Sequence, residues 1–120
     1  MKLCITAKGN NLEAEIDPRF GRCTYFIIVD TETLEFKAME NPNEVASGGA
    51  GVQSGQLIAG EKVAAVVTGN VGPNAYQTLS SLNVKIYVGA SGLVKEAIEA
   101  FKQGKLKQAQ DSTVPKDSGK

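Results

Sequence analysis

The chain has 120 residues, a length typical of one domain, and 42% of them are hydrophobic, as in ordinary globular proteins. Thirteen lysines and arginines balance thirteen aspartates and glutamates, so the zero net charge gives no overall field to attract nucleic acid or an anionic membrane. The absence of histidine excludes Ser-His-Asp and Cys-His catalysis and zinc sites that use imidazole. No apolar run approaches the length of a membrane span or a signal-peptide core, so we expect a cytoplasmic protein with reduced cysteines.

Three strands are predicted in the first half of the chain. Residues 2–7 form a short, mostly apolar run that ends at a Lys-Gly-Asn-Asn turn, and residues 23–29 are rich in aromatic and β-branched side chains. Residues 34–39 alternate apolar and polar side chains, which is typical of a strand with one wet face. A polar turn joins the last two runs. We therefore expect a hairpin with 34–39 at the sheet edge, where Glu35 and Lys37 discourage pairing with another edge.

Helices and strands alternate in the second half. The expected elements are a helix at 52–59, a strand buried on both faces at 63–67, a helix that starts at Pro73, a strand at 84–88 and a last helix after residue 91. Tyr76, Leu79 and Leu82 should form the buried stripe of the second helix, and Ser91 is the expected N-cap of the last one. Beyond Gly104 the sequence is polar and lacks periodicity, which is typical of a disordered tail.

This order predicts a three-layer α/β/α domain. Right-handed crossovers through the helices place the later strands parallel to the first, and the hairpin makes strand 2 antiparallel to its neighbours. The expected sheet is therefore mixed and five-stranded. It belongs to a single domain at residues 1–106, which is followed by a disordered tail at 107–120.

The predicted topology brings several loops to one edge of the sheet, where the carboxyl ends of the parallel strands meet. These loops span residues 8–22, 41–51, 68–72 and 89–91. Three of them lead into helix N-termini, whose unpaired N–H groups and positive dipole ends attract anions. Arg19 and Arg22 add positive charge. Each loop alone is better explained by the glycines and prolines that ordinarily precede a helix, and Arg19 could simply pair with Asp17. Only the convergence of the loops favours an anion-binding site.

The two cysteines have different predicted roles. Cys4 lies within an apolar strand and is expected to be a small buried hydrophobe. Cys23 follows Arg22, which would lower the pKa of its thiol, so Cys23 is the candidate for a reactive or metal-ligating thiol, although a purely structural role fits equally well. Antiparallel pairing would place Cys4 opposite about residue 27, roughly 13 Å from Cys23, whereas a disulfide needs Cα atoms within about 7 Å. We expect no disulfide.

Five short motifs together resemble the dinitrogenase iron–molybdenum cofactor biosynthesis family, in particular its small stand-alone, orange-protein-like members. The motifs are Ile-Asp-Pro-Arg-Phe-Gly-Arg-Cys at 16–23, Glu-Asn-Pro-Asn at 40–43, Gly-Gly-Ala-Gly at 48–51, Thr-Gly-Asn-Val-Gly-Pro at 68–73 and Gly-Ala-Ser-Gly at 89–92. The resemblance covers about residues 1–106. It implies a ribonuclease H-like motif of the nitrogenase accessory factor type without nuclease activity.

The resemblance also implies a function and a site. The implied function is storage, delivery or assembly of an anionic metal–sulfur cluster, of the Fe–Mo–S or Mo–Cu–S type, by a non-enzymatic monomer or weak dimer that meets cluster-donor or acceptor proteins. The implied site comprises Arg19, Phe20, Gly21, Arg22, Cys23, Gly49, Ala50, Gly51, Asn70, Gly72 and Ser91. Many family members have histidine where this chain has Arg19, so a direct metal ligand would have to be Cys23. Otherwise charge and backbone N–H groups would hold the cluster.

Two other functions stay open at this point. The same sheet edge could serve a metal-free regulatory domain that binds a small anion or a nucleotide. An enzyme of the ribonuclease H type would need several acids at one point. That reading ranks last, because Asp17 is expected at the opposite sheet edge from Asp30 and Glu32.

Overall fold

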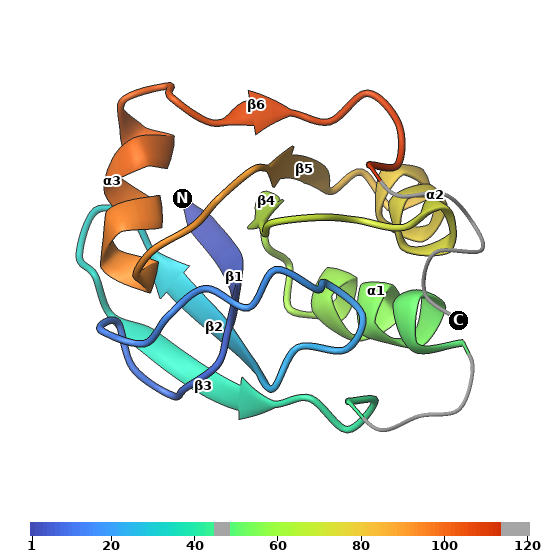
Figure 1. The fold of residues 1–120 in the computed structure, drawn as a ribbon, viewed down its shortest axis with the longest axis horizontal. Coiled ribbons are helices and arrows are strands. Elements are labelled where there is room, and N and C mark those ends of the chain that lie inside the picture. Colours follow the sequence, from blue (N-terminus) through green and yellow to red (C-terminus); the bar gives the residue numbers. More distant parts are fainter. Residues whose placement is uncertain (45–48, 114–120) are drawn as a thin grey trace.

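The computed structural model describes residues 1–44 and 49–113, and Figure 1 shows the arrangement of their strands and helices. The elements are β1 (Lys2–Ala7), β2 (Tyr25–Asp30), β3 (Phe36–Glu40), α1 (Ala50–Gly60), β4 (Ala65–Val67), α2 (Pro73–Ser81), β5 (Lys85–Val88), α3 (Val94–Lys102) and β6 (Lys107–Gln108). The described strands form one sheet in the order β3-β2-β1-β4-β5-β6. None of the helices in these ranges is long and apolar enough to cross a lipid bilayer.

The sheet is mixed, as predicted. β1 pairs in parallel with β4, and β4 with β5, whereas β2 runs antiparallel to both β1 and β3. Every residue of β1 after Lys2 is buried because this strand lies inside the sheet and is covered on both faces. Cys4 packs into the core beneath α1 and α2, whereas Leu3 and Ile5 belong to the core beneath α3. The apolar run at residues 2–7 therefore contributes side chains to the cores on both faces of the sheet.

The helices complete three layers, with α1 and α2 on one face and α3 on the other (Figure 1). α1 and α2 pack closely because α1 carries glycine where the two helices meet. A Cβ added at Gly55 would lie 2.9 Å from Cγ2 of Thr78. The predicted stripe of α2 is right for Leu79, which is fully buried, but wrong for Leu82, which is 47% exposed at the helix end. The buried residues of α2 are Ala75 and Leu79.

The predicted tail contains a sixth strand, so the expected count of five is wrong. β6 pairs antiparallel with β5, and the N–H of Ala109 then donates to the carbonyl of Ile86 at 2.8 Å. Ala109 itself is buried. Disorder was predicted from polar composition, but a two-residue edge strand needs only backbone partners and shows no periodicity. The prediction of disorder is therefore wrong for residues 107–113, and residues 114–120 lie outside the described ranges.

Candidate functional site

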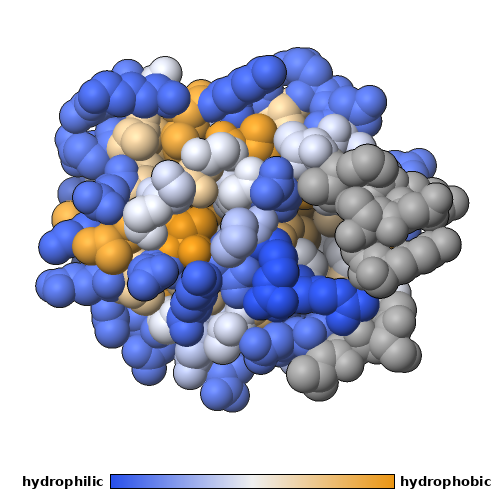
Figure 2. Space-filling model, viewed as in Figure 1, coloured by the Kyte–Doolittle hydropathy of each residue, from blue (hydrophilic) through white to orange (hydrophobic). Residues whose placement is uncertain are grey.

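The loop between β1 and β2 lies against the loop that follows β4, at the predicted edge of the sheet. Arg19 and Asn70 form a parallel β-bridge, and the N–H of Asn70 donates to the carbonyl of Pro18 at 2.8 Å. A Cβ added at Gly69 would lie 2.8 Å from Cα of Pro18, so glycine is required for this close approach. Figure 2 shows a strongly hydrophilic strip over the part of the β1–β2 loop that lies nearest α1 in Figure 1.

The same loop also lies against the first turn of α1. A Cβ added at Gly21 would lie 3.0 Å from both Cα and N of Gly51. A Cβ added at Gly51 would in turn lie 3.3 Å from the backbone N of Ala75 in α2. The β1–β2 loop and the first turns of α1 and α2 therefore meet at one place. We call the residues 49–52 and 72–75, which form these two first turns, the two-helix edge.

Among residues 1–44 and 49–113, no side chain caps either helix start in the two-helix edge. The N-cap of α1 is Gly49, in the left-handed region at φ 72°, and the N-cap of α2 is Gly72, followed by Pro73. The first N–H groups of a helix have no partner within the helix, and both dipoles present their positive ends here. Backbone N–H groups and dipole ends of this kind favour an anion nearby.

The third helix start that the sequence placed at this edge is already occupied. The N–H groups of Val94 and Lys95 donate to the carbonyls of Ala14 and Leu12, at 2.8 and 2.9 Å. The N–H of Leu93 donates to the carboxylate of Glu96 at 2.8 Å. The N-cap of α3 is Leu93, so the prediction of Ser91 as the N-cap is wrong.

The geometry also separates Ser91 from the two-helix edge. Ser91 is exposed in the loop that enters α3, on the opposite face of the sheet from α1 and α2. Of the predicted site residues, those of the motifs at 16–23, 48–51 and 68–73 lie around the two-helix edge. Ser91 does not, although the N–H of Gly89 in its motif donates to the carbonyl of Gly69 at 3.0 Å.

Arg19 is held by a buried carboxylate. Its Nε donates to Oδ1 of Asp17 at 3.1 Å and its Nη2 donates to Oδ2 at 3.0 Å. The Asp17 side chain is only 1% exposed, whereas that of Arg19 is 60% exposed. The hydrogen bond with Asp17 is the main reason that the pKa of Arg19 is raised above its ordinary value. The simple pairing considered from the sequence is therefore present, and it fixes the guanidinium while cancelling much of its charge.

Two predicted site residues lie in the core instead of facing a ligand. Phe20 is 2% exposed, and its ring packs against Phe26 with centroids 5.8 Å apart. Cys23 is fully buried, and burial, helped by the negative charge of Asp17, raises the pKa of its thiol far above the ordinary value. The lowering effect of Arg19 is smaller, so of the two roles that the sequence left open the structural one fits Cys23 better. Cys4 is also a free, buried thiol, and it pairs across the sheet with Ile28.

A buried polar group that the sequence analysis did not single out holds the loop in place. Nδ2 of Asn41 donates to the carbonyls of Gly21 and Cys23, at 3.0 and 2.9 Å. Oγ of Ser54 in α1 donates to the same Gly21 carbonyl at 3.0 Å. The only sequence signal was the Glu-Asn-Pro-Asn motif, which gave no indication that its first asparagine would be buried. These bonds fix the position of the β1–β2 loop relative to α1.

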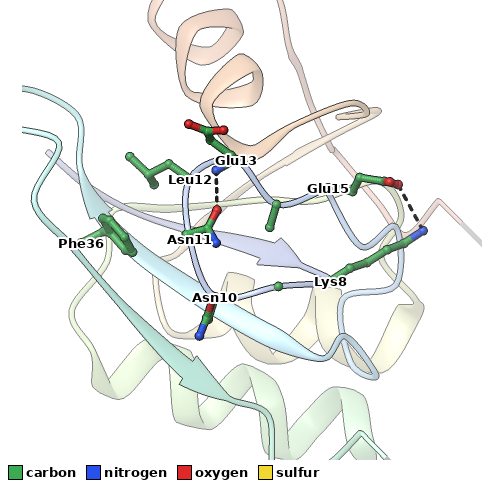
Figure 3. A pocket seen from close by; sticks show the side chains of 9 residues that line it. Lys8, Asn10, Asn11, Leu12, Glu13, Glu15 and Phe36 are labelled. Carbon is green, nitrogen blue, oxygen red and sulfur yellow. Dashed lines mark hydrogen bonds and ion pairs between the residues drawn. The ribbon is translucent and has the colours of Figure 1, made fainter.

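Within residues 1–44 and 49–113, no three or more cysteine, aspartate and glutamate side chains form a group that could hold a metal ion. A separate depression of about 820 Å³ lies between residues 8–15 and Phe36 of β3 (Figure 3). Its rim carries an ion pair between Lys8 and Glu15 at 3.7 Å. None of the predicted site residues lines it. The chemistry predicted from the sequence therefore belongs to the two-helix edge and not to this depression.

Comparison with known proteins agrees with this fold. The chain is 34% identical over 111 residues to an uncharacterized protein of Methanocaldococcus jannaschii, covering 90% of this chain and 91% of that one. The apo form of the orange protein from Desulfovibrio gigas superposes with a TM-score of 0.90 at 32% identity, covering 94% of this chain and 96% of that one. A NifB-like protein of the DUF35 family from Thermotoga gives a TM-score of 0.82 at 35% identity, with coverages of 94% and 97%. Residues 1–104 match the sequence profile described as "Dinitrogenase iron-molybdenum cofactor", and the chain belongs to that family.

Proposed function

We propose that this chain is a carrier that binds an anionic metal–sulfur cluster as cargo at the two-helix edge, without catalysing a reaction. The observation that carries the proposal is the meeting of two helix starts, neither of which is capped by a side chain of the described residues, beside a loop with two arginines. Backbone N–H groups in such a position are fixed in advance, so they bind an anion without having to be ordered first.

The donors at this edge suit a cluster whose metals already have sulfide ligands. Such a cluster needs no metal ligands from the protein and instead presents negative sulfur atoms, which accept hydrogen bonds from N–H groups. Direct ligation by Cys23 fits less well, because the thiolate is the form that binds metals and burial keeps this thiol protonated. We therefore infer that backbone N–H groups and charge hold the cluster, and that Cys23 serves the core beneath it.

The relatives support the same class of cargo. The family description names the iron–molybdenum cofactor, and the orange protein from Desulfovibrio gigas is described in an apo form, which implies a ligand for that protein. For this chain we infer an iron–molybdenum–sulfur or molybdenum–copper–sulfur cluster, received from one protein and delivered to another. Two free thiols suit a reducing compartment such as the cytoplasm.

Anaerobic titration with copper and tetrathiomolybdate tests the proposal, with optical spectra and metal analysis after desalting. The wild type should retain coloured metal, and Cys23→Ala should retain it as well. Arg22→Gln should weaken retention, whereas Lys95→Gln, which removes the same charge from exposed Lys95 on α3, should not. No retained metal in the wild type would overturn the proposal. Loss of metal in a folded Cys23→Ala variant would instead point to ligation by the thiol.

The metal-free alternative rests on the same geometry, because uncapped helix starts also accept phosphate groups. A ligand that binds the native state raises the melting temperature. Thermal shift with nucleotides and phosphorylated metabolites therefore separates the two functions. A rise with phosphates and none with tetrathiomolybdate would favour a metal-free regulatory domain.

A further inference from the structure

The C-terminal segment of the described chain reaches back to the two-helix edge. After β6, Ala109 is buried against the sheet, and the chain then runs to the loop that precedes α2 (Figure 1). Thr113 meets Val71 there through both its backbone and its side chain. We call residues 109–113 the strap. The strap lies beyond residue 104, where the family match ends.

The contact between Thr113 and Val71 uses both polar groups of the Val71 backbone. The N–H of Thr113 donates to the carbonyl of Val71 at 2.8 Å. The N–H of Val71 donates to Oγ1 of Thr113 at 2.8 Å, and the same hydroxyl lies 3.3 Å from the Val71 carbonyl. Val71 immediately precedes Gly72, the N-cap of α2. A side-chain hydroxyl of the strap therefore already satisfies a backbone donor directly beside the proposed anion site.

We propose that Thr113 is a built-in competitor for the anionic ligand, a role that rests on the function proposed above. The neighbouring N–H of Asn70 is committed to Pro18, so Val71 offers the first exchangeable donor before α2. A cluster-sized anion seated on the first turn of α2 takes the N–H of Val71 and displaces the Thr113 hydroxyl. When the cluster is released, the Thr113 hydroxyl again accepts a hydrogen bond from the N–H of Val71, which would otherwise have no partner.

Competition of this kind suits a carrier. A site that must accept and then release its cargo benefits from an internal group that replaces the cargo at the same donor. Thr113 is exposed, and the strap follows an edge strand of only two residues, so Thr113 can leave Val71 without opening the core. Buried Ala109 keeps the start of the strap anchored while its end moves.

The test compares two variants of the full chain, titrated anaerobically with tetrathiomolybdate. Thr113→Val removes the hydroxyl and should tighten binding by about 3- to 10-fold, the amount that one hydrogen bond of this kind contributes. Thr113→Ser keeps the hydroxyl and should bind as the wild type does. In the wild type, saturation with tetrathiomolybdate should also speed hydrogen exchange of the Thr113 amide. Once Thr113 leaves Val71, the bond from this amide to the Val71 carbonyl is lost together with the bond to the hydroxyl.

The outcomes distinguish a failure of the strap proposal from a failure of the proposed cluster site. Equal or weaker binding by Thr113→Val, beside a wild type that binds, overturns the strap proposal and leaves the cluster site standing. Absence of binding in the wild type and both variants overturns both proposals.

Discussion

The two buried thiols predict that this protein loses stability in alkaline solution. Both Cys4 and Cys23 are fully buried, and burial is the main cause of the raised pKa of each thiol. In the unfolded chain a thiol ionises with a pKa of about 8.5. Above that pH the unfolded state loses protons that the folded state keeps. The contribution of the thiols is therefore fully present below pH ~8.5 and is lost as the pH rises toward the raised folded pKa.

The magnitude follows from the linkage between proton binding and folding. Each thiol that stays protonated in the folded state costs about 1.4 kcal/mol of unfolding free energy per pH unit above its unfolded pKa. At pH 10, about 1.5 units above that pKa, the loss is roughly 2 kcal/mol for one thiol and roughly 4 kcal/mol for both. This is a large share of the total stability of a small domain.

Urea unfolding at pH 7 and pH 10, with reductant present, measures this loss. Cys23→Ala and Cys4→Ala should each lose about 2 kcal/mol less than the wild type between the two pH values. Lysine and tyrosine residues also titrate in this range, but they are the same in all three proteins and cancel in the comparison. If wild type and Cys23→Ala lost stability equally, the thiol would ionise as freely in the folded as in the unfolded chain. The argument that its pKa is raised by burial would then be wrong.

Further predictions concern the loops around the site and one turn. Gly69→Ala should destabilise the fold by about 1–3 kcal/mol in urea unfolding, because its Cβ would overlap the β1–β2 loop. Gly60→Ala, where a Cβ meets nothing within 4 Å, should be neutral or slightly stabilising, and equal effects would contradict the packing argument. Asn41→Ala should cost about 1–3 kcal/mol, measured in the same way, by leaving buried carbonyls without a donor, whereas Asn10→Ala at an exposed position should cost little. The backbone N–H groups of the β2–β3 turn lower the pKa of Asp30, so its contribution is present above its unfolded pKa of about 3.9 and is lost as the pH falls through the lower folded value. Asp30→Ala should therefore lose less stability than the wild type on acidification in a thermal melt, and an identical loss would refute this.

Element order and type could be predicted because each long element carries its own signal. The apolar run of β1 and the glycines and Pro73 before the helices are local features, and they gave the α/β/α layers and the mixed sheet. The ends of elements moved by up to two residues where tertiary contacts decide them. α1, for example, starts at Ala50, where the close packing of Gly51 against α2 fixes the first turn. β6 could not be predicted, because two exposed residues carry no pattern and form a strand only through their pairing with β5.

The candidate site could be predicted only where the strand topology determines which loops lie close together. The rule that loops gather at the carboxyl ends of parallel strands placed Arg19, Gly51 and Asn70 near one another. It could not show that carbonyls of residues 12 and 14 already satisfy the start of α3, because that contact joins segments about 80 residues apart. Nor could it show that Cys23 points inward, which depends on long-range bonds from Asn41. Sequence proximity of an arginine to a thiol says little when burial has the larger effect on the pKa.

The zero net charge of the chain and its proposed affinity for an anion are compatible, because the attraction does not need net charge. Arg19 is neutralised by Asp17, so the fixed pair contributes mainly position and oriented N–H donors. The two helix starts contribute partial positive charge from backbone dipoles, which requires no lysine or arginine and leaves the sequence composition balanced. Because the first turns of α1 and α2 pack directly against each other, an anion bound at the two-helix edge would lie near the positive ends of both dipoles.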